Sequence, residues 1–148
     1  MLIAKIPSTP AEWEKYYDLR FVVLREPWHQ KKGSEVLTDE NEADHVMAID
    51  SDDSETDELL GVARLQMNSA TQGQVRCVAV SKNAQGKGVG KFLMKYLEDL
   101  GKSKGLEEII LDARINALDF YKAIGYEIYA DSYLLFGEIQ HWKMKKQL

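Results

Sequence analysis

Residues Val75 to Lys104 read VRCVAVSKNAQGKGVGKFLMKYLEDLGKSK, which is an apolar strand-like run, a glycine-rich turn and an amphipathic helix pattern in direct succession. Gly86, Gly88 and Gly90 allow the backbone to turn sharply and to approach a ligand closely. The helix that begins there directs unpaired N–H groups and the positive end of its dipole at the turn, and two lysines add charge. The stretch therefore predicts a site for a phosphate-bearing ligand.

The spacing of the turn distinguishes between three known phosphate loops. The ATP-binding P-loop needs a Lys followed by Ser or Thr, but Lys91 is followed by Phe92. The dinucleotide fingerprint GxGxxG, counted from Gly86, would need glycine where Lys91 stands. The pattern (Gln/Arg)xxGx(Gly/Ala) is met in full by the run QGKGVG, residues 85–90. This run resembles the acetyl-CoA pyrophosphate loop of the GNAT-type N-acetyltransferase superfamily.

Two further segments resemble the same family. Residues 78–81 (VAVS) are similar to the end of its central strand, whose main chain pairs with the pantetheine arm of the cofactor. Residues 116–126 (NALDFYKAIGY) are similar to its helix carrying FYxxxGF/Y. The resemblance implies an α/β GNAT (acyl-CoA N-acyltransferase) fold, with a mixed, mostly antiparallel sheet and helices on both faces. It also implies that two neighbouring parallel strands, 75–80 and 106–111, splay apart.

Roles for individual residues follow from that resemblance. The phenol of Tyr121 would protonate the leaving thiolate, which suits a group whose reference pKa is about 10. Asn116 would hold the pantetheine arm or a bridging water, and the N–H of Val80 or a neighbour would polarise the thioester carbonyl. Tyr121 as a plain core aromatic and Gln85 as a plain helix cap are the structural alternatives. The implied contacts to acetyl-CoA, the expected cosubstrate, are Val78, Ala79, Val80, Gln85, Gly86, Lys87, Gly88, Val89, Gly90, Lys91, Asn116 and Phe120.

Candidates on the acceptor side are less specific. In many relatives the segment after the first helix walls the acceptor pocket, although here it could also be a surface turn with a half-buried Trp. The C-terminal IQHWKM resembles the IxHxxM of one subgroup of bacterial GNAT proteins, but a histidine on a terminal strand is ordinary. The general base stays open, because the family position for a Glu is Gln74, which cannot take a proton; ordered water or one of Glu26, His29, His45 and Asp112 could deprotonate the amine instead. The candidates for substrate contact or base are Arg25, Glu26, Trp28, His29, His45, Asp112 and His141.

The remaining sequence fits one N-acetyltransferase domain over residues 1–148. A chain of 148 residues with 45% hydrophobic content can bury one core without disulfides. Thr9, Pro10 and Glu12 have the form of a capping box at the start of a first helix that Pro27 stops. The other expected elements are strands at 2–6, 43–50, 59–67, 75–80, 106–111, 126–130 and 139–146, and helices at 89–104 and 116–125.

Composition bounds the class of protein. Cys77 is the only cysteine, so no intramolecular disulfide can form, and we expect it to be a small buried residue on a strand. No metal is expected from three scattered histidines. No run approaches the roughly 20 apolar residues of a membrane span, and no secretion signal is recognisable, so a cytoplasmic location is expected. The net charge of −5 argues against nucleic acid as a partner. A monomer or homodimer is expected.

The resulting prediction is an N-acetyltransferase that moves an acetyl group from acetyl-CoA to a primary amine of a small molecule or peptide, by direct attack in a ternary complex. The alternative is a non-catalytic acyl-CoA-binding or sensing protein, which Gln74 favours. Acidic residues between positions 39 and 58 could attract a cationic amine or could simply be solvated around a hairpin tip.

Overall fold

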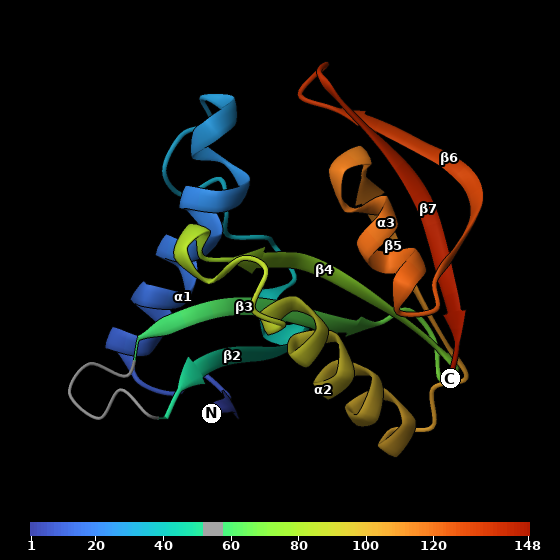
Figure 1. Ribbon diagram of the computed structural model, residues 1–148, viewed down its shortest axis with the longest axis horizontal. Coiled ribbons are helices and arrows are strands. Elements are labelled where there is room, and N and C mark those ends of the chain that lie inside the picture. The colour runs from blue at the N-terminus through green and yellow to red at the C-terminus, as the bar shows by residue number, and fades with distance from the viewer. Residues whose placement is uncertain (52–57) are drawn as a thin grey trace.

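In the computed structural model, which describes residues 1–51 and 58–148, seven strands form one mixed sheet (Figure 1). The strand order is β1-β2-β3-β4-β5-β7-β6, and every neighbouring pair is antiparallel except β4 and β5. The strands are β1 (Leu2–Lys5), β2 (Asp44–Asp50), β3 (Leu59–Met67), β4 (Gln72–Val80), β5 (Glu108–Arg114), β6 (Glu127–Leu135) and β7 (Ile139–Gln147). The helices are α1 (Pro10–Leu24), α2 (Val89–Ser103) and α3 (Leu118–Ala123), with short 3₁₀ turns η1 (Glu26–Trp28), η2 (Glu40–Glu42), η3 (Lys82–Ala84) and η4 (Ile115–Ala117).

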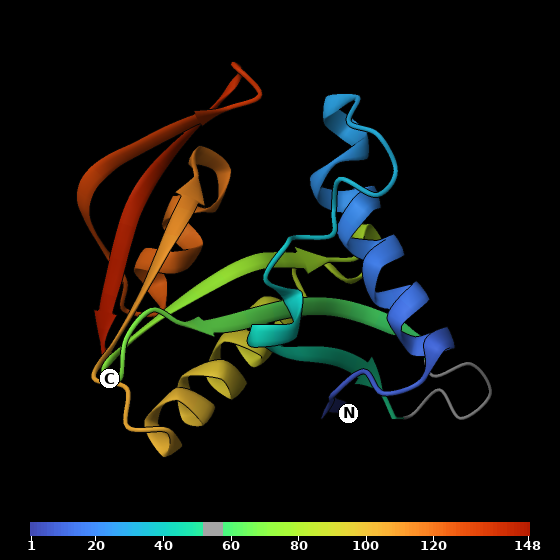
Figure 2. The same cartoon turned by 180° about the vertical axis from the view of Figure 1, so that it is seen from behind.

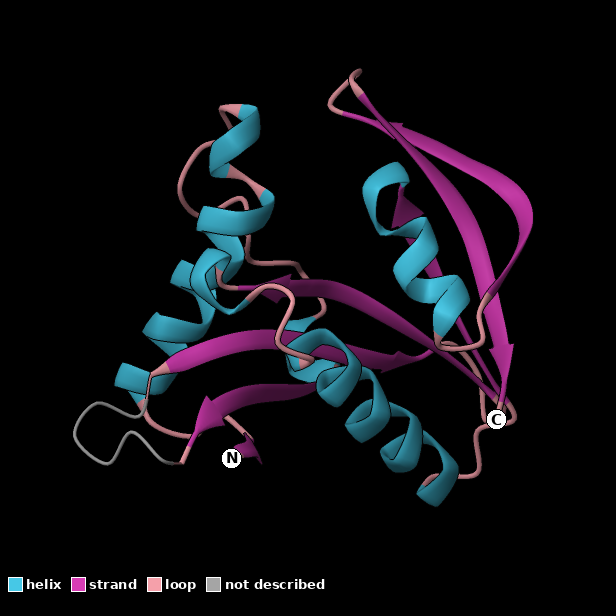
Figure 3. Ribbon diagram, viewed as in Figure 1, coloured by secondary structure: helices cyan, strands magenta, loops and turns pink. Residues whose placement is uncertain are grey.

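Helices lie on both faces of the sheet, as the sequence predicted. Helix α1 packs on one face of β3 and β4, whereas α2 packs on the other face of β2, β3 and β4 (Figures 1 and 2). Helix α3 lies beside β5 and β7 on the same side as α2 (Figure 3). The described part of the chain contains no helix that is long and apolar enough to cross a membrane.

The larger core lies between α2 and the sheet. Leu93 and Leu97 are fully buried on α2 and pack with Val46, Leu65 and Ile109 of the strands. Their three-to-four spacing is the helical periodicity that the sequence displays. This packing fixes the N-terminus of α2, and with it the glycine-rich turn, relative to the end of β4.

The capping box predicted at the start of α1 is present. The Thr9 hydroxyl accepts a hydrogen bond from the Glu12 amide (3.1 Å), and a Glu12 carboxylate oxygen accepts one from the Thr9 amide (3.2 Å). Pro10 occupies the first turn, where its missing N–H costs nothing. The two fully buried side chains of this helix are Tyr16 and the charged Arg20, and five apolar residues of the same helix are partly buried against a cluster of strand residues.

Changing Thr9 to Ala should lower the free energy of unfolding by about 1 kcal/mol, because the Glu12 amide loses its only capping oxygen. Urea unfolding monitored by circular dichroism measures the change. Thr9→Ser keeps the hydroxyl and should stay close to wild type. Equal losses for the two variants would contradict a role of the hydroxyl in capping.

Three elements near the C-terminus differ from the expected bounds. Helix α3 is shorter than residues 116–125, because residues 115–117 form the separate 3₁₀ turn η4 and the helix ends at Ala123. Strand β5 spans Glu108–Arg114 instead of the expected residues 106–111. It extends to Arg114 because its last three residues pair with Trp142 and the two residues beside it on β7. Strand β6 continues to Leu135 rather than ending at Ala130, with two register shifts against β7 along the way. Because β5 ends later than expected, Asp112 and Arg114 lie within the strand and their side chains are held on one face of the sheet.

The parallel strands β4 and β5 separate, as the sequence predicted. Paired positions are confined to Gln72, Gly73 and Gln74 of β4, which face Glu108 to Ile110 of β5. Beyond them the strands diverge into the open V seen in Figure 1. Strand β4 also carries an irregularity opposite β3 at Cys77, whose φ of 57° lies in the left-handed region. Such bulges redirect side chains and are common next to active sites.

Candidate active site

A cleft of about 140 Å³ opens where β4 and β5 diverge. Its walls come from the two strands, from the end of α1, from η4 and α3, and from the β6–β7 hairpin. Side chains from both faces of the sheet reach it, so a ligand from the α3 side and one from the α1 side can meet there. Its lining residues are Leu24, Arg25, Val75, Arg76, Cys77, Val78, Leu111, Asp112, Ala113, Arg114, Ala117, Tyr121, Tyr133, Leu135 and His141.

Tyr121 reaches this cleft from α3. The side chain is 8% exposed, and its ring packs edge-on against Phe120 and Tyr126. Among the described residues its hydroxyl has no hydrogen-bond partner, and the oxygen is not one of the buried unpaired atoms, so it is accessible from the cleft. Burial raises the pKa of Tyr121 above its usual value, and the positive charge of Arg114 acts in the opposite sense without reversing the shift. The phenol therefore stays protonated near neutral pH and can donate a proton.

The glycine-rich turn has the backbone geometry expected of an anion site. Gly86 and Gly88 have φ angles of 78° and 82°, a region that residues with a side chain rarely adopt. Gly88 is the N-cap of α2, and no described side chain caps the first amides of the helix. Lys87 and Lys91 are exposed on the same turn. Amides and positive charge are thus available to an anionic group at this end of α2.

Phe120 connects the turn to α3. A Cβ at Gly90 would lie only 3.1 Å from the Phe120 Cζ atom, so the ring lies directly over the helix backbone. The residue that follows Phe120 is Tyr121, so the helix that carries the tyrosine packs on the start of α2, next to the glycine-rich turn. Asn116 is exposed on η4, at the start of the same segment.

Asp112 supplies a carboxylate at the cleft. One oxygen accepts a hydrogen bond from the Ser132 hydroxyl (2.5 Å), and the other lies 3.4 Å from the Gln74 side-chain amide. Gln74 in turn accepts a hydrogen bond from Asn68 (3.1 Å). The residue at the family's glutamate position therefore acts here as a donor that orients a carboxylate on the neighbouring strand.

His141 lies on the α1 side of the cleft, on β7 next to Arg114 of β5. Its Nδ1 donates to the Ile139 carbonyl (2.9 Å), and the Tyr133 ring stacks on it with the centroids 4.6 Å apart. Burial lowers the pKa of His141, so the neutral imidazole dominates at neutral pH. Asp112 and His141 are the two titratable side chains of the lining that could accept a proton.

Several predicted residues lie outside the lining of this cleft. Glu26 and His29 are exposed on and after η1, and Trp28 is half-buried there. His45 lies on β2, two strands away from the cleft, with its Nδ1 2.7 Å from the Tyr16 hydroxyl and its Nε2 2.8 Å from the Glu40 carbonyl. His45 therefore cannot contact a ligand in this cleft, because its ring is buried beneath α1.

The expected buried position of Cys77 is wrong, since this side chain is half-buried and lines the cleft.

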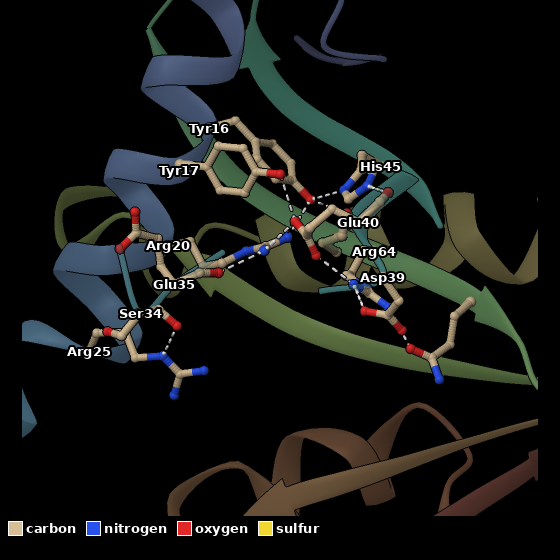
Figure 4. A network of polar contacts seen from close by, with 12 residues as sticks. Tyr16, Tyr17, Arg20, Arg25, Ser34, Glu35, Asp39, Glu40, His45 and Arg64 are labelled. Atoms are coloured by element: carbon tan, nitrogen blue, oxygen red, sulfur yellow. Dashed lines mark hydrogen bonds and ion pairs between the residues drawn. The ribbon is translucent and has the colours of Figure 1, made fainter. Parts of the chain in front are cut away.

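A buried ionic network connects α1, the segment before β2 and strand β3 (Figure 4). Glu40 accepts hydrogen bonds from Arg20 (2.7 Å), Arg64 (2.5 Å) and the Tyr17 hydroxyl (2.7 Å). Arg64 is also paired with Asp39 (3.0 Å). The network ties the segment before β2 to α1 and β3, and so supports the helix whose last residue, Leu24, reaches the cleft. The acidic residues at 39 and 40 are neutralised here, while positions 52–57 of the acidic connection lie outside the described residues.

The sequence reasoning missed Arg76, Arg114 and Tyr133 as lining residues. Arg76 and Arg114 alternate with apolar residues on β4 and β5, and that alternation was the signal that could have placed them on the α1 side. Tyr133 lies beyond the expected end of its strand, so its position could not be assigned.

Comparison with known proteins identifies the family to which this fold and cleft belong. The family model of the Acetyltransferase (GNAT) family matches residues 13–126. The chain belongs to this family. It is 31% identical over 107 residues, 72% of either chain, to the uncharacterized N-acetyltransferase YjcF of Bacillus subtilis.

Solved structures agree on the fold. An aminoglycoside 6'-N-acetyltransferase complexed with coenzyme A is 18% identical and superposes with a TM-score of 0.81 over 99% of this chain and 96% of the other. The ribosomal-protein-S18-alanine N-acetyltransferase of Escherichia coli is 14% identical, with a TM-score of 0.78 over 99% and 94%. At these identities the likeness establishes the fold, and the acceptors named for those two proteins differ from each other.

Proposed function

We propose that this protein transfers an acetyl group from acetyl-CoA to a primary amine by direct attack within a ternary complex. The observation that carries the proposal is the position of the Tyr121 hydroxyl. Burial of the ring keeps this phenol protonated, and the hydroxyl has no hydrogen-bond partner among the described residues and is accessible from the cleft. Phe120, the residue before Tyr121, packs on the start of α2 beside the glycine-rich turn.

The residues fit acetyl-CoA as cosubstrate. The turn from Gln85 to Lys91 offers amides and lysine charge to a diphosphate, and the edge of β4 beyond Gln74 has no paired strand toward β5, so its main chain is free for a pantetheine arm. When bound, the cosubstrate supplies the acetyl thioester. Val78 and Tyr121 line the cleft at the end of that edge.

The chain's own groups divide the proton transfers between them. In the overall reaction the amine nitrogen forms a bond to the acetyl carbon, the carbon–sulfur bond breaks, and the amine proton is lost while the thiolate gains one. Asp112 or His141 receives the proton of the amine, and Tyr121 donates the proton to the thiolate. No covalent step on the protein is needed, although Cys77 lines the cleft.

A thiol-release assay tests the proposal. Purified protein with acetyl-CoA should release free thiol only when an acceptor amine is added, across a panel of amino acids, polyamines, aminoglycosides and peptides with free N-termini. Mass spectrometry should find the acetylated amine. Coenzyme A should also stabilise the protein by about 2.7 kcal/mol at a concentration 100 times its Kd.

Two outcomes would contradict parts of the proposal. Binding of coenzyme A without thiol release for any acceptor would favour the sensing alternative, which the sequence raised through Gln74. Loss of transfer in Cys77→Ala, with an acetylated Cys77 trapped in the wild-type protein, would replace direct attack by an acetyl-enzyme route.

A further inference from the structure

The charge of the cleft is opposite to that of the whole chain. Arg25, Arg76 and Arg114 line it, and Asp112 is the one carboxylate among the lining residues, so the lining carries three positive charges against one negative. The chain as a whole has a net charge of −5. A surplus of two positive charges in a partly enclosed site of an acidic protein attracts anions.

The arginines are also distributed unevenly. The chain has only five, and two of these, Arg20 and Arg64, are fully buried and each paired with a carboxylate. The other three all line the cleft, and none of them has a carboxylate within ion-pair distance among the described residues. All 14 lysines lie outside the lining. Arginine, unlike lysine, presents a planar fork of donors that matches a carboxylate or phosphate group.

The hydrogen bonds of these arginines leave donors available. Arg114 gives one long contact of 3.4 Å to the Leu24 carbonyl, and Arg25 donates its Nε to the Ser34 carbonyl (3.2 Å). The guanidinium of Arg76 makes no hydrogen bond to a described residue, and none of the three side chains has a buried unpaired nitrogen, so their free N–H groups are accessible from the cleft.

The surroundings of Arg114 contrast with those of the paired arginines. Burial, followed by the positive charge of Arg25, lowers the pKa of Arg114. Burial acts in the same direction on Arg20 and Arg64, but their pKa values are raised because nearby negative groups outweigh it. A bound anion in the cleft would give Arg114 the partner that the protein itself provides for the other two.

From this arrangement we propose that the acceptor is a compact amine that also carries an oxyanionic group, and that Arg76 and Arg114, with Arg25 at the rim, bind that group. The inference rests on the proposed acetyl transfer. The arginines hold the anionic end on the α1 side of the cleft, which leaves the amine near Asp112 and Tyr121. A carboxylate and a phosphate share the chemistry that such a site recognises.

Matched acceptor pairs test this assignment. Glycine and glycinamide, and β-alanine and β-alaninamide, differ in one carboxylate, and phosphoethanolamine and ethanolamine differ in the phosphate. Values of kcat/KM should be calculated from the concentration of unprotonated amine, since an amide group lowers the pKa of the neighbouring amine. We expect at least one anionic member to exceed its neutral partner by tenfold or more, and the better of the carboxylate and phosphate arms identifies the group.

Variants then identify which residues cause the preference for an anionic acceptor. Arg76→Gln and Arg114→Gln should raise KM for the anionic acceptor tenfold or more and remove most of the difference in kcat/KM between that acceptor and its neutral partner, while the Kd for coenzyme A stays at the wild-type value. Lys31→Gln removes the same charge from an exposed loop and should behave like wild type. Circular dichroism and calorimetric titration of coenzyme A confirm that each variant is folded.

The results separate two kinds of failure. Equal use of neutral and anionic acceptors would overturn the inference while leaving acetyl transfer intact. Weaker coenzyme A binding in both arginine variants would also overturn it, because the arginines would then belong to the cosubstrate site. No thiol release with any amine would instead refute the proposed function. In that case calorimetric binding of β-alanine and phosphate to the coenzyme A complex still decides the anion site, since an absence of binding overturns it.

Discussion

Changing Tyr121 to Phe should lower kcat for acetyl transfer by about 100- to 10,000-fold, the range typical of general-acid catalysis. The variant removes one hydroxyl and keeps the ring that packs against Phe120 and Tyr126. Since that hydroxyl has no partner among the described residues, its loss should leave stability and coenzyme A affinity close to wild type. Steady-state thiol release and calorimetric titration of coenzyme A measure the two effects separately.

Tyr126→Phe is the matched control. Its ring lies 5.8 Å from that of Tyr121, but its hydroxyl donates to Glu98 (3.0 Å) and not into the cleft. The control should therefore lose some stability and keep its kcat. Because burial raises the pKa of Tyr121, no loss of rate between pH 7 and 9 should arise from its ionisation. Wild-type turnover in Tyr121→Phe would contradict the assignment.

The parts of the fold that the sequence predicted well are those determined by local chemistry. The Thr9 capping box, the sharp turn at Gly86 and Gly88 and the helical spacing of Leu93 and Leu97 each follow from a few neighbouring residues. The separation of β4 and β5 came from the family resemblance and is confirmed by their short pairing.

The parts that escaped prediction depend on residues far apart in the sequence. Arg76 and Arg114 lie on different strands, and only the sheet order shows that both face one cleft. Because Gln74 stands where relatives carry a glutamate, the sequence suggested that the general base is missing. The register of β4 against β5, however, places Gln74 next to the carboxylate of Asp112. His45 could not be placed either, because its burial depends on partners in α1 and η2.

Arg20 is the clearest case of such a long-range effect. Arginine is a residue type that is almost never fully buried unless it is paired, yet the side chain of Arg20 is fully buried. The compensation comes from Glu40, which is 20 residues away and also faces Arg64. Burial of a charge is tolerated when a hydrogen-bonded counter-charge accompanies it. No periodicity in the sequence connects these residues.

Changing Glu40 to Gln should therefore lower the free energy of unfolding at pH 7 by about 3 to 5 kcal/mol, since removing one partner leaves buried charge uncompensated. The amide keeps the shape of the side chain and can still accept from Arg20 or Arg64, so the loss reports the missing charge. Asp39 continues to neutralise Arg64, whereas Arg20 retains only neutral acceptors, the carbonyl of Glu35 and the Tyr16 hydroxyl. The cost should fall mainly on Arg20.

The pH dependence of the loss gives this prediction a second test. Burial by itself raises the pKa of Glu40, but hydrogen bonds from Tyr17 and Arg20 and the arginine charges outweigh it, so the folded-state pKa is lowered. The stabilisation is then fully present above the unfolded pKa and is lost as the pH falls through the folded pKa. Urea unfolding of wild type and Glu40→Gln should converge on acidification.

A matched surface change separates buried from exposed charge. Asp99 pairs with Lys95 on the outer face of α2 (2.8 Å), and both side chains are more than half exposed. Asp99→Asn should leave the urea midpoint close to that of wild type, because solvent screens such exposed pairs. If Glu40→Gln cost no more than Asp99→Asn, the Arg20 charge would have to be solvated rather than buried, and α1 would pack on the sheet differently from the arrangement described above.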